Sequence, residues 1–172
     1  MIRSILYATD LGLYAPYVLQ HALALARTFK ARLHVVHVVE PMGLFAESVL
    51  QTYVDETRLK ELRSTGLETV MSNIELRVLE GFRDELGDNP EDVDLIGSVS
   101  VLRGDPPIFI LEHAQKLAVD LLVVGSHSHG AALEVPMGRT AARLLQLCDV
   151  PVYLVPMPVS YTHLTLPTTP YV

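Results

Sequence analysis

The sequence predicts a single α/β domain over residues 1–158, with a doubly wound parallel β-sheet between two layers of helices. Two observations support this prediction. Short continuous apolar runs, typical of strands that are covered on both faces, recur along the chain. Between them lie longer segments whose apolar residues recur every three or four positions, as in amphipathic helices. Strands that alternate with helices form right-handed crossovers, and these crossovers produce a parallel sheet.

Five strands and four helices are expected in this alternation. The first helix has Pro16 in its first turn, where the missing N–H costs nothing because it would have no intrahelical acceptor. The acidic stretch 85–94 is expected to be a solvent-exposed loop. The expected strands are residues 2–9, 33–39, 94–103, 121–124 and 151–155, and the expected helices are residues 15–29, 59–86, 108–117 and 140–147.

The composition is that of an ordinary globular domain and argues against several classes of function. Hydrophobic residues make up 49% and charged residues 19% of the chain, and the formal net charge is −7. Because nucleic acids and anionic membranes bind through clustered lysines and arginines, neither is expected as a partner. No apolar run reaches the roughly 18 residues that a membrane-spanning helix needs. The single cysteine, Cys148, and a first strand that lacks signal-peptide features favour a cytoplasmic protein.

Residues 159–172 differ in composition from the rest of the chain. They are rich in threonine and proline and lack helical or strand periodicity. The segment resembles a translated sequencing adapter or a cloning scar, so we exclude this tail from the predicted domain.

Two of the predicted strands end at residues that can contact a ligand. Asp10 follows the first strand, and Gly125 follows the fourth. In parallel α/β sheets, ligands bind outside the carboxyl ends of the strands, at the point where the strand order reverses. Residues 125–140, GSHSHGAALEVPMGRT, form a glycine-containing loop that leads into a helix. Such a loop can bind phosphate, because backbone N–H groups converge there and the helix dipole favours an anion.

Three segments give the chain a resemblance to the universal stress protein family that extends over about residues 2–157. The sequence ILYATD at 5–10 is similar to the family's opening strand and its terminal aspartate. The sequence VHVVE at 36–40 is similar to its second strand. The loop that begins at Gly125 and the segment PVYLV at 151–155 are similar to its glycine loop and closing strand.

The resemblance implies a sheet order of 3-2-1-4-5, which makes the first and fourth strands neighbours. It also implies a site for ATP or another adenine nucleotide in the crevice between them. Asp10 would contact the ribose or the adenine there, and the backbone of Val38 would pair with the adenine edge. Family members usually form homodimers through the last strand, which is residues 151–155 in this chain.

The ATP-binding branch of the family has the loop pattern G-x2-G-x9-G-[ST], which this chain matches in part. Gly125 and Gly138 occupy the first and third glycine positions, where we expect glycine for the backbone conformation. Ser128 replaces the second glycine, and Arg139 stands at the Ser/Thr position, one residue before Thr140. The candidate nucleotide-binding residues are Thr9, Asp10, Val38, Gly125, His127, Ser128, Gly138, Arg139 and Thr140.

Some of these residues have an alternative role. Asp10 could cap the helix that follows it, as aspartate often does. The Arg139 guanidinium could bind a terminal phosphate, or it could occupy the phosphate site and pair with Glu134 or Asp10. Glu134 would repel a phosphate unless it points outward or binds a metal, and Pro136 removes one N–H donor from the loop. Two functions therefore stay open: a stress protein that binds an adenine nucleotide, or a nucleotide-free homodimer whose ancestral ATP site is closed.

A catalytic or metal-dependent function is not expected. His127 and His129 are close in sequence, but no cysteine or carboxylate lies at a spacing suited to a shared metal. His34 and His37 lie three positions apart on a strand and therefore point to opposite faces. The serines beside His127 lack the G-x-S-x-G nucleophile elbow of hydrolases. Because no residue resembles a positioned general base, slow ATP hydrolysis or nucleotidyl transfer ranks below a binding function.

Overall fold

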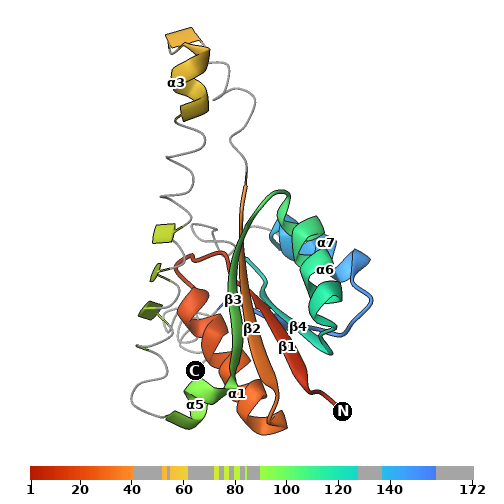
Figure 1. Ribbon diagram of the computed structural model, residues 1–172. Coiled ribbons are helices and arrows are strands. Elements are labelled where there is room, and N and C mark those ends of the chain that lie inside the picture. Colours follow the sequence, from red (N-terminus) through yellow and green to blue (C-terminus); the bar gives the residue numbers. More distant parts are fainter. Residues whose placement is uncertain are drawn as a thin grey trace, which may run out of the picture.

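A five-stranded, fully parallel β-sheet forms the centre of the structure (Figure 1). Its strand order, β3-β2-β1-β4-β5, confirms the predicted fold and puts β1 and β4 side by side. The computed structural model describes residues 1–40, 52–53, 55–61, 72–73, 76–77, 80–81, 84, 90–127 and 137–157. The strands are β1 (Ser4–Ala8), β2 (Arg32–Val39), β3 (Ile96–Arg103), β4 (Leu121–Gly125) and β5 (Val152–Val155).

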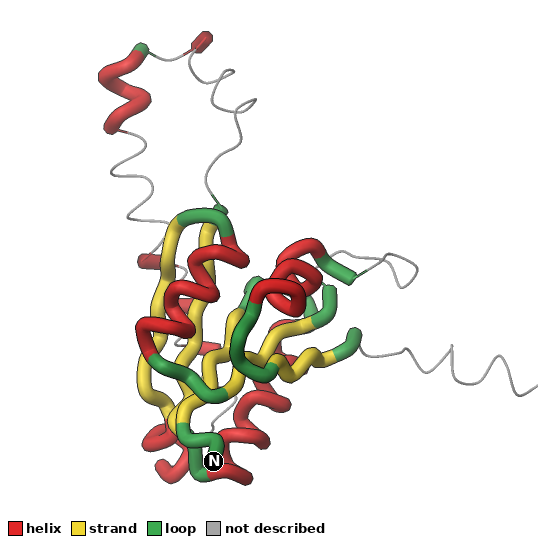
Figure 2. The backbone as a smooth tube through the Cα atoms, turned by 90° about the vertical axis from the view of Figure 1, so that its right-hand side faces the viewer, coloured by secondary structure: helices red, strands yellow, loops and turns green. Residues whose placement is uncertain are grey.

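Helices cover both faces of this sheet (Figures 1 and 2). One face packs against α1 and α5, and the other packs against α6 and α7. Lys30 (φ 52°) and Ala118 (φ 51°) are left-handed and end α1 and α6, so neither helix continues into the next strand. The described helices are α1 (Ala15–Phe29), α3 (Glu56–Glu61), α5 (Pro90–Leu95), α6 (Pro106–Leu117) and α7 (Arg139–Leu147).

Alternate residues of the strands build two hydrophobic cores, one on each face of the sheet. Ile5 and Tyr7 of β1 pack on the α1 side, while Leu6 between them packs on the side of α6 and α7. On β2, Val35 and Val36 divide in the same way. The central strands β1, β2 and β4 are therefore buried on both faces, which explains why they appear in the sequence as apolar runs, whereas no residue of the edge strand β3 is fully buried.

The acidic stretch at 85–94 is not wholly a loop, because its second half belongs to helix α5. Glu91 and Asp92 lie in the first turn of that helix, where the helix dipole stabilises carboxylates. Asp92 is buried, and its two oxygens accept hydrogen bonds from Nε and Nη2 of Arg27 on α1, at 2.8 and 2.7 Å. This ion pair thus joins α5 to α1, whereas in the sequence the acidic residues of α5 gave no indication of a helix or of a partner.

The predicted helix at 59–86 lies largely outside the described residues. Helix α3 begins at Glu56, before the predicted start, and the described residues between 72 and 84 are helical. The tail at 159–172 also lies outside the described residues. In the part of the chain that the structure describes, no helix is long and apolar enough to cross a bilayer.

Candidate functional site

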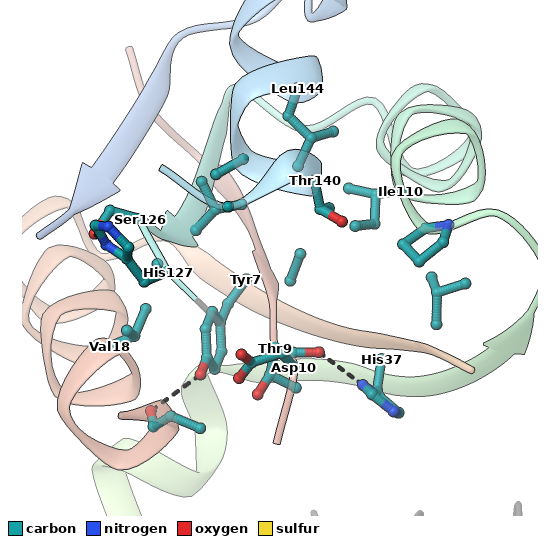
Figure 3. Close-up of a pocket in the computed structure, with 18 of the residues that line it drawn as sticks. Tyr7, Thr9, Asp10, Val18, His37, Ile110, Ser126, His127, Thr140 and Leu144 are labelled. Carbon is teal, nitrogen blue, oxygen red and sulfur yellow. Dashed lines mark hydrogen bonds between the residues drawn. The ribbon is translucent and has the colours of Figure 1, made fainter. Parts of the chain in front are cut away.

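A pocket opens at the carboxyl ends of β1, β2 and β4, beside the N-terminal ends of α6 and α7 (Figure 3). Its volume of about 520 Å³ is typical of small-molecule sites. It lies where the strand order reverses, which is the place where ligands usually bind in parallel α/β sheets. Of the candidate residues, Ser128 lies outside the described residues, and the others all line the pocket: Thr9, Asp10, Val38, Gly125, His127, Gly138, Arg139 and Thr140.

The turn between β1 and α1 is held by bonds from backbone to side chains. Leu11 N–H donates to Thr9 Oγ1 at 3.1 Å, and Gly12 N–H donates to Asp10 Oδ1 at 2.8 Å. These bonds support Leu11 in the left-handed region (φ 58°), which is unfavourable for leucine. The residue that caps α1 is Tyr14, so the alternative role of Asp10 as the helix cap is wrong. Asp10 is exposed at the pocket, and its carboxylate can accept further hydrogen bonds there.

His37 ties this turn to the second strand. Its Nδ1 lies 2.7 Å from the carbonyl oxygen of Thr9, as the dashed line in Figure 3 shows. A carbonyl oxygen can only accept, so Nδ1 carries the proton and donates it. Thr9 N–H also donates to the carbonyl oxygen of Val36 at 2.9 Å. Both backbone polar groups of Thr9, a buried residue, are therefore bound to β2.

The two loop glycines have ordinary backbone conformations. Gly138 has φ −55° and ψ 147°, and Gly125 has no positive φ, so the conformational reason that we expected for both is wrong. At Gly125 the constraint is space instead. A Cβ there would lie 3.2 Å from Cγ2 of Val18 on α1, closer than most Cβ contacts. The approach of α1 to the end of β4 therefore accounts for this glycine.

Ser126, directly after β4, organises the loop through all of its polar groups. Its N–H donates to the carbonyl of Val155 on β5 (2.9 Å), and its own carbonyl accepts from Gly138 N–H (2.8 Å). Its hydroxyl oxygen accepts from Met157 N–H (3.1 Å) and lies 2.7 Å from Nδ1 of His127. The start of the loop, its end and the segment after β5 thus meet at one buried serine.

The helix that follows the loop presents its N-terminus to the pocket. Arg139 and Thr140 are the first residues of α7, and no side chain among the described residues caps the helix. N–H groups of a first turn have no intrahelical acceptor, so they can donate to an anion. Within the described residues, Arg139 makes no ion pair, so its expected alternative pairing with Asp10 does not occur. Glu134 and Pro136 lie outside the described residues.

Charge is unevenly distributed around the pocket. The carboxylates of Asp10 and Glu40 lie at the ends of β1 and β2, whereas Arg139 belongs to the wall formed by α7. Figure 3 shows Asp10 and Thr140 on opposite sides of the space. The site therefore has hydrogen-bond acceptors on one side and cationic and N–H donor groups on the other.

The walls between these polar ends are apolar. Val18 of α1, Ile110 of α6 and Leu144 of α7 line them, and all three are buried. Tyr7 is buried as well, and its hydroxyl donates to the carbonyl of Ala15 at 3.0 Å. Burial raises the pKa of Tyr7 well above its ordinary range, so this phenol stays neutral and serves as a structural donor. The pocket thus offers apolar contact surface between its polar ends.

The histidines of β2 serve separate sites. His34 Nδ1 lies 2.7 Å from the hydroxyl oxygen of Ser98 on β3, whereas His37 binds Thr9. Among the described residues, no group of three or more potential metal ligands occurs. Sequence analysis missed Ser126 and His37 as organising residues of the pocket. A serine in a glycine loop is ordinary, but a histidine in an apolar strand needs a buried partner, and that was a signal for His37.

Comparison with known proteins shows similarity to universal stress proteins. A sequence model of the Universal stress protein family matches residues 1–156. The chain is 26% identical over 156 residues to Universal stress protein YxiE of Bacillus subtilis (strain 168), which covers 90% of this chain and 99% of that protein. It is also 32% identical over 59 residues to Stress response protein NhaX of the same organism, or 34% of this chain and 36% of that protein.

Solved structures share the fold at low sequence identity. Hypothetical protein MJ0577 matches with a TM-score of 0.68 and 21% identity over 93% of this chain and 99% of that one. Universal stress protein UspA from Lactobacillus plantarum matches with a TM-score of 0.57 and 17% identity, over 90% and 97% of the two chains. A universal stress protein in complex with cAMP matches with a TM-score of 0.54 and 16% identity, over 90% and 96%. Since the family's sequence model covers nearly the whole domain, this chain belongs to the universal stress protein family.

Proposed function

We propose that this universal stress protein binds an adenine nucleotide in the pocket between β1 and β4. The observation that carries the proposal is the separation of charge within that one pocket. Acceptors lie at the ends of β1 and β2, at Asp10 and Glu40, while Arg139 and the N-terminus of α7 lie on the other side. A nucleotide has the matching polarity, with ribose hydroxyl donors toward one end and phosphate oxygens at the other.

The nucleoside would occupy the side formed by β1 and β2. One oxygen of Asp10 accepts from Gly12, and the carboxylate retains lone pairs that ribose hydroxyls can donate to. Hydrogen bonds to charged groups contribute roughly 1.5–3 kcal/mol each. The apolar walls, including Val18 and Ile110, supply contact area for the base.

The phosphates would lie against α7. The N–H groups of Arg139 and Thr140 have no intrahelical acceptors, and the helix dipole adds partial positive charge at the same place. The Arg139 guanidinium supplies a permanent cation suited to phosphate oxygens. Because the net charge of the chain is −7, this local positive potential is what would attract the anion.

A structural relative supports the class of ligand. The universal stress protein solved with cAMP has the same fold, and cAMP combines adenine, ribose and one phosphate. ATP, ADP, AMP and cAMP share the nucleoside that the Asp10 side would recognise and differ in the phosphates that α7 would meet. The proposed function is accordingly that of a binding module, whose affinity depends on the number and form of the phosphates.

Isothermal titration with ATP, ADP, AMP and cAMP tests the proposal directly. We expect at least one of them to bind, and Asp10→Asn to weaken that binding about ten- to hundredfold through loss of a charged acceptor. Asp55→Asn, an equal change of charge on an exposed residue outside the pocket lining, is the control. Mass spectrometry of the denatured protein tests whether nucleotide is carried through purification. If none of the four nucleotides binds, the alternative of a nucleotide-free homodimer stands instead.

A further inference from the structure

The side chain of His37 makes a hydrogen bond that a backbone N–H of β2 would make in a regular parallel ladder. In a regular parallel ladder, a residue donates its N–H to one residue of the next strand and accepts from the residue two positions further along. Ala8 is in register with Val36, so Thr9 comes opposite His37. Thr9 N–H donates to Val36, as the ladder requires. The regular partner of the Thr9 carbonyl would then be the N–H of Val38.

The Thr9 carbonyl instead accepts from the imidazole of His37. The Nδ1–oxygen distance is 2.7 Å, as expected for a well-formed bond. Among the described residues, no hydrogen bond joins Val38 N–H to Thr9. The ladder between β1 and β2 therefore ends one bond early, and the donor to the Thr9 carbonyl is a side chain of β2 instead of a backbone N–H.

As a result, the backbone of Val38 faces the pocket. Successive residues of β2 direct their polar backbone groups to opposite neighbours: Val36 binds the β1 side, and the Val39 carbonyl accepts from Gly104, after β3, at 3.0 Å. Val38 consequently directs its N–H and C=O toward the β1 side, just beyond the point where the ladder ends. Val38 also lines the pocket, so a donor and an acceptor stand side by side at its edge.

We propose that His37 is a positioning residue for base recognition: by holding the Thr9 carbonyl, it keeps the backbone edge of Val38 open to the ligand. This inference rests on the proposed function. Adenine presents an acceptor (N1) beside a donor (the 6-amino group), which complements that edge. Hypoxanthine presents a donor and a carbonyl at the same two places and mismatches both. His37 thus favours a 6-aminopurine through the backbone of Val38.

A comparison of ATP with ITP in two variants tests this role. In His37→Leu the Thr9 carbonyl loses its donor and can accept from Val38, so we expect ATP affinity to fall about ten- to hundredfold. ITP affinity should change much less, because its base gains little from the open edge. His37→Asn keeps an N–H near the position of Nδ1 and should retain the ATP/ITP ratio of the parent. A merely structural role would weaken both nucleotides alike and leave the ratio unchanged, which would overturn the inference.

Amide exchange measured by NMR on the parent protein gives a test that needs neither ligand nor variant. We expect Val38 N–H to exchange much faster than Val36 N–H, although both lie in the same strand. Equal protection of the two amides would overturn the inference even if His37→Leu fails to fold. A parent that binds ATP, with an unchanged ATP/ITP ratio in His37→Leu, overturns the role of His37 alone. A parent that binds no nucleotide overturns the proposed function as well.

Discussion

Arg27 on α1 donates two hydrogen bonds to Asp92 on α5, and this bidentate pair joins the two helices on one face of the sheet. Arg27 lowers the pKa of the Asp92 carboxyl, because its hydrogen bonds favour the charged form. α5 is short, and Leu95 is the residue of the helix that packs against the core, so we expect its docking to depend strongly on the ion pair as well. We expect Asp92→Asn to lower the melting temperature and to speed amide exchange across Pro90–Leu95.

Asp94 provides the control for that experiment. It lies on the same helix and is exposed, so Asp94→Asn makes the same change in charge without breaking the pair with Arg27. The control should melt like the parent. If both variants melt alike, the ion pair does not anchor α5, and the buried position of Asp92 needs another explanation.

Two partly buried histidines, His34 and His113, should make the stability of the protein depend on pH. Burial lowers the pKa of His34 on β2, and the charges of His113 and Arg32 lower it further. Burial also lowers the pKa of His113 on α6, and the charge of Lys116 adds to that effect. Below the ordinary value of 6.5 the unfolded chain therefore binds more protons than the folded one. Stability from these groups is present above that pH and is lost as the pH falls below it, toward the lower pKa that the histidines have in the folded protein. Denaturant unfolding at pH 7.5 and 5.5 should give a lower free energy at pH 5.5.

His113→Leu separates these histidines from other sources of acid sensitivity. The Nε2 atom of His113 is buried and has no hydrogen-bond partner among the described residues, so an apolar replacement removes an unsatisfied group. At pH 7.5 the variant should be at least as stable as the parent, and its loss on going to pH 5.5 should be smaller. The Asp92 carboxyl does not contribute in this window, because Arg27 lowers its pKa further below it. An unchanged pH dependence would exclude His113 as a contributor.

The central strands of the sheet could be predicted from the sequence because they are buried on both faces, which leaves continuous apolar runs such as that of Leu121–Gly125. The position of the site followed from where β1 and β4 end. What could not be predicted depends on contacts between distant residues. In the sequence Asp92 belongs to an acidic run that is typical of a solvated loop, but in the fold α1 places Arg27 beside it. His37, a histidine in an apolar strand, indicated that it has a polar partner, but the identity of that partner, a backbone carbonyl, has no signature in the sequence.

The edge strand β5 is where we expect a second copy of the chain to pair. The carbonyl of Pro151 accepts from Leu122 of β4, and the carbonyl of Val155 accepts from Ser126, directly after β4. Because alternate residues of a strand face opposite neighbours, Val152 and Leu154 direct their backbone groups to the open edge. An open apolar edge is a liability unless it is paired. We therefore expect a two-fold homodimer at micromolar concentration, measured by light scattering.

Val152→Pro tests the edge without touching the ladder to β4. Proline removes only the outward N–H of residue 152, which antiparallel pairing with a second copy would use. Val152→Ala shortens the side chain but keeps that N–H, so it controls for lost packing. The proline variant should be a folded monomer and the alanine variant a dimer. A parent that is monomeric, or a proline variant that stays dimeric, would contradict pairing through β5.

Arg139 distinguishes an open nucleotide site from a closed one. If its guanidinium binds phosphate, Arg139→Ala should weaken ATP binding about ten- to hundredfold, as expected for a lost charge-assisted contact. If the guanidinium fills the phosphate site instead, the same change should create or strengthen binding. We expect weakening, because no ion pair among the described residues holds Arg139 inside the pocket.

Two variants make the result of that titration specific. Arg143→Ala removes an equal charge one turn further along α7, from a residue that pairs with Asp105 at 3.6 Å, and it should change ATP affinity much less. Arg139→Lys keeps the charge but loses the planar fork, so its affinity should fall between those of the parent and Arg139→Ala. The difference between Arg139→Ala and the parent should grow from AMP to ATP, because each added phosphate raises the charge that faces α7. Equal losses for AMP and ATP would place the guanidinium against the nucleoside rather than the terminal phosphates.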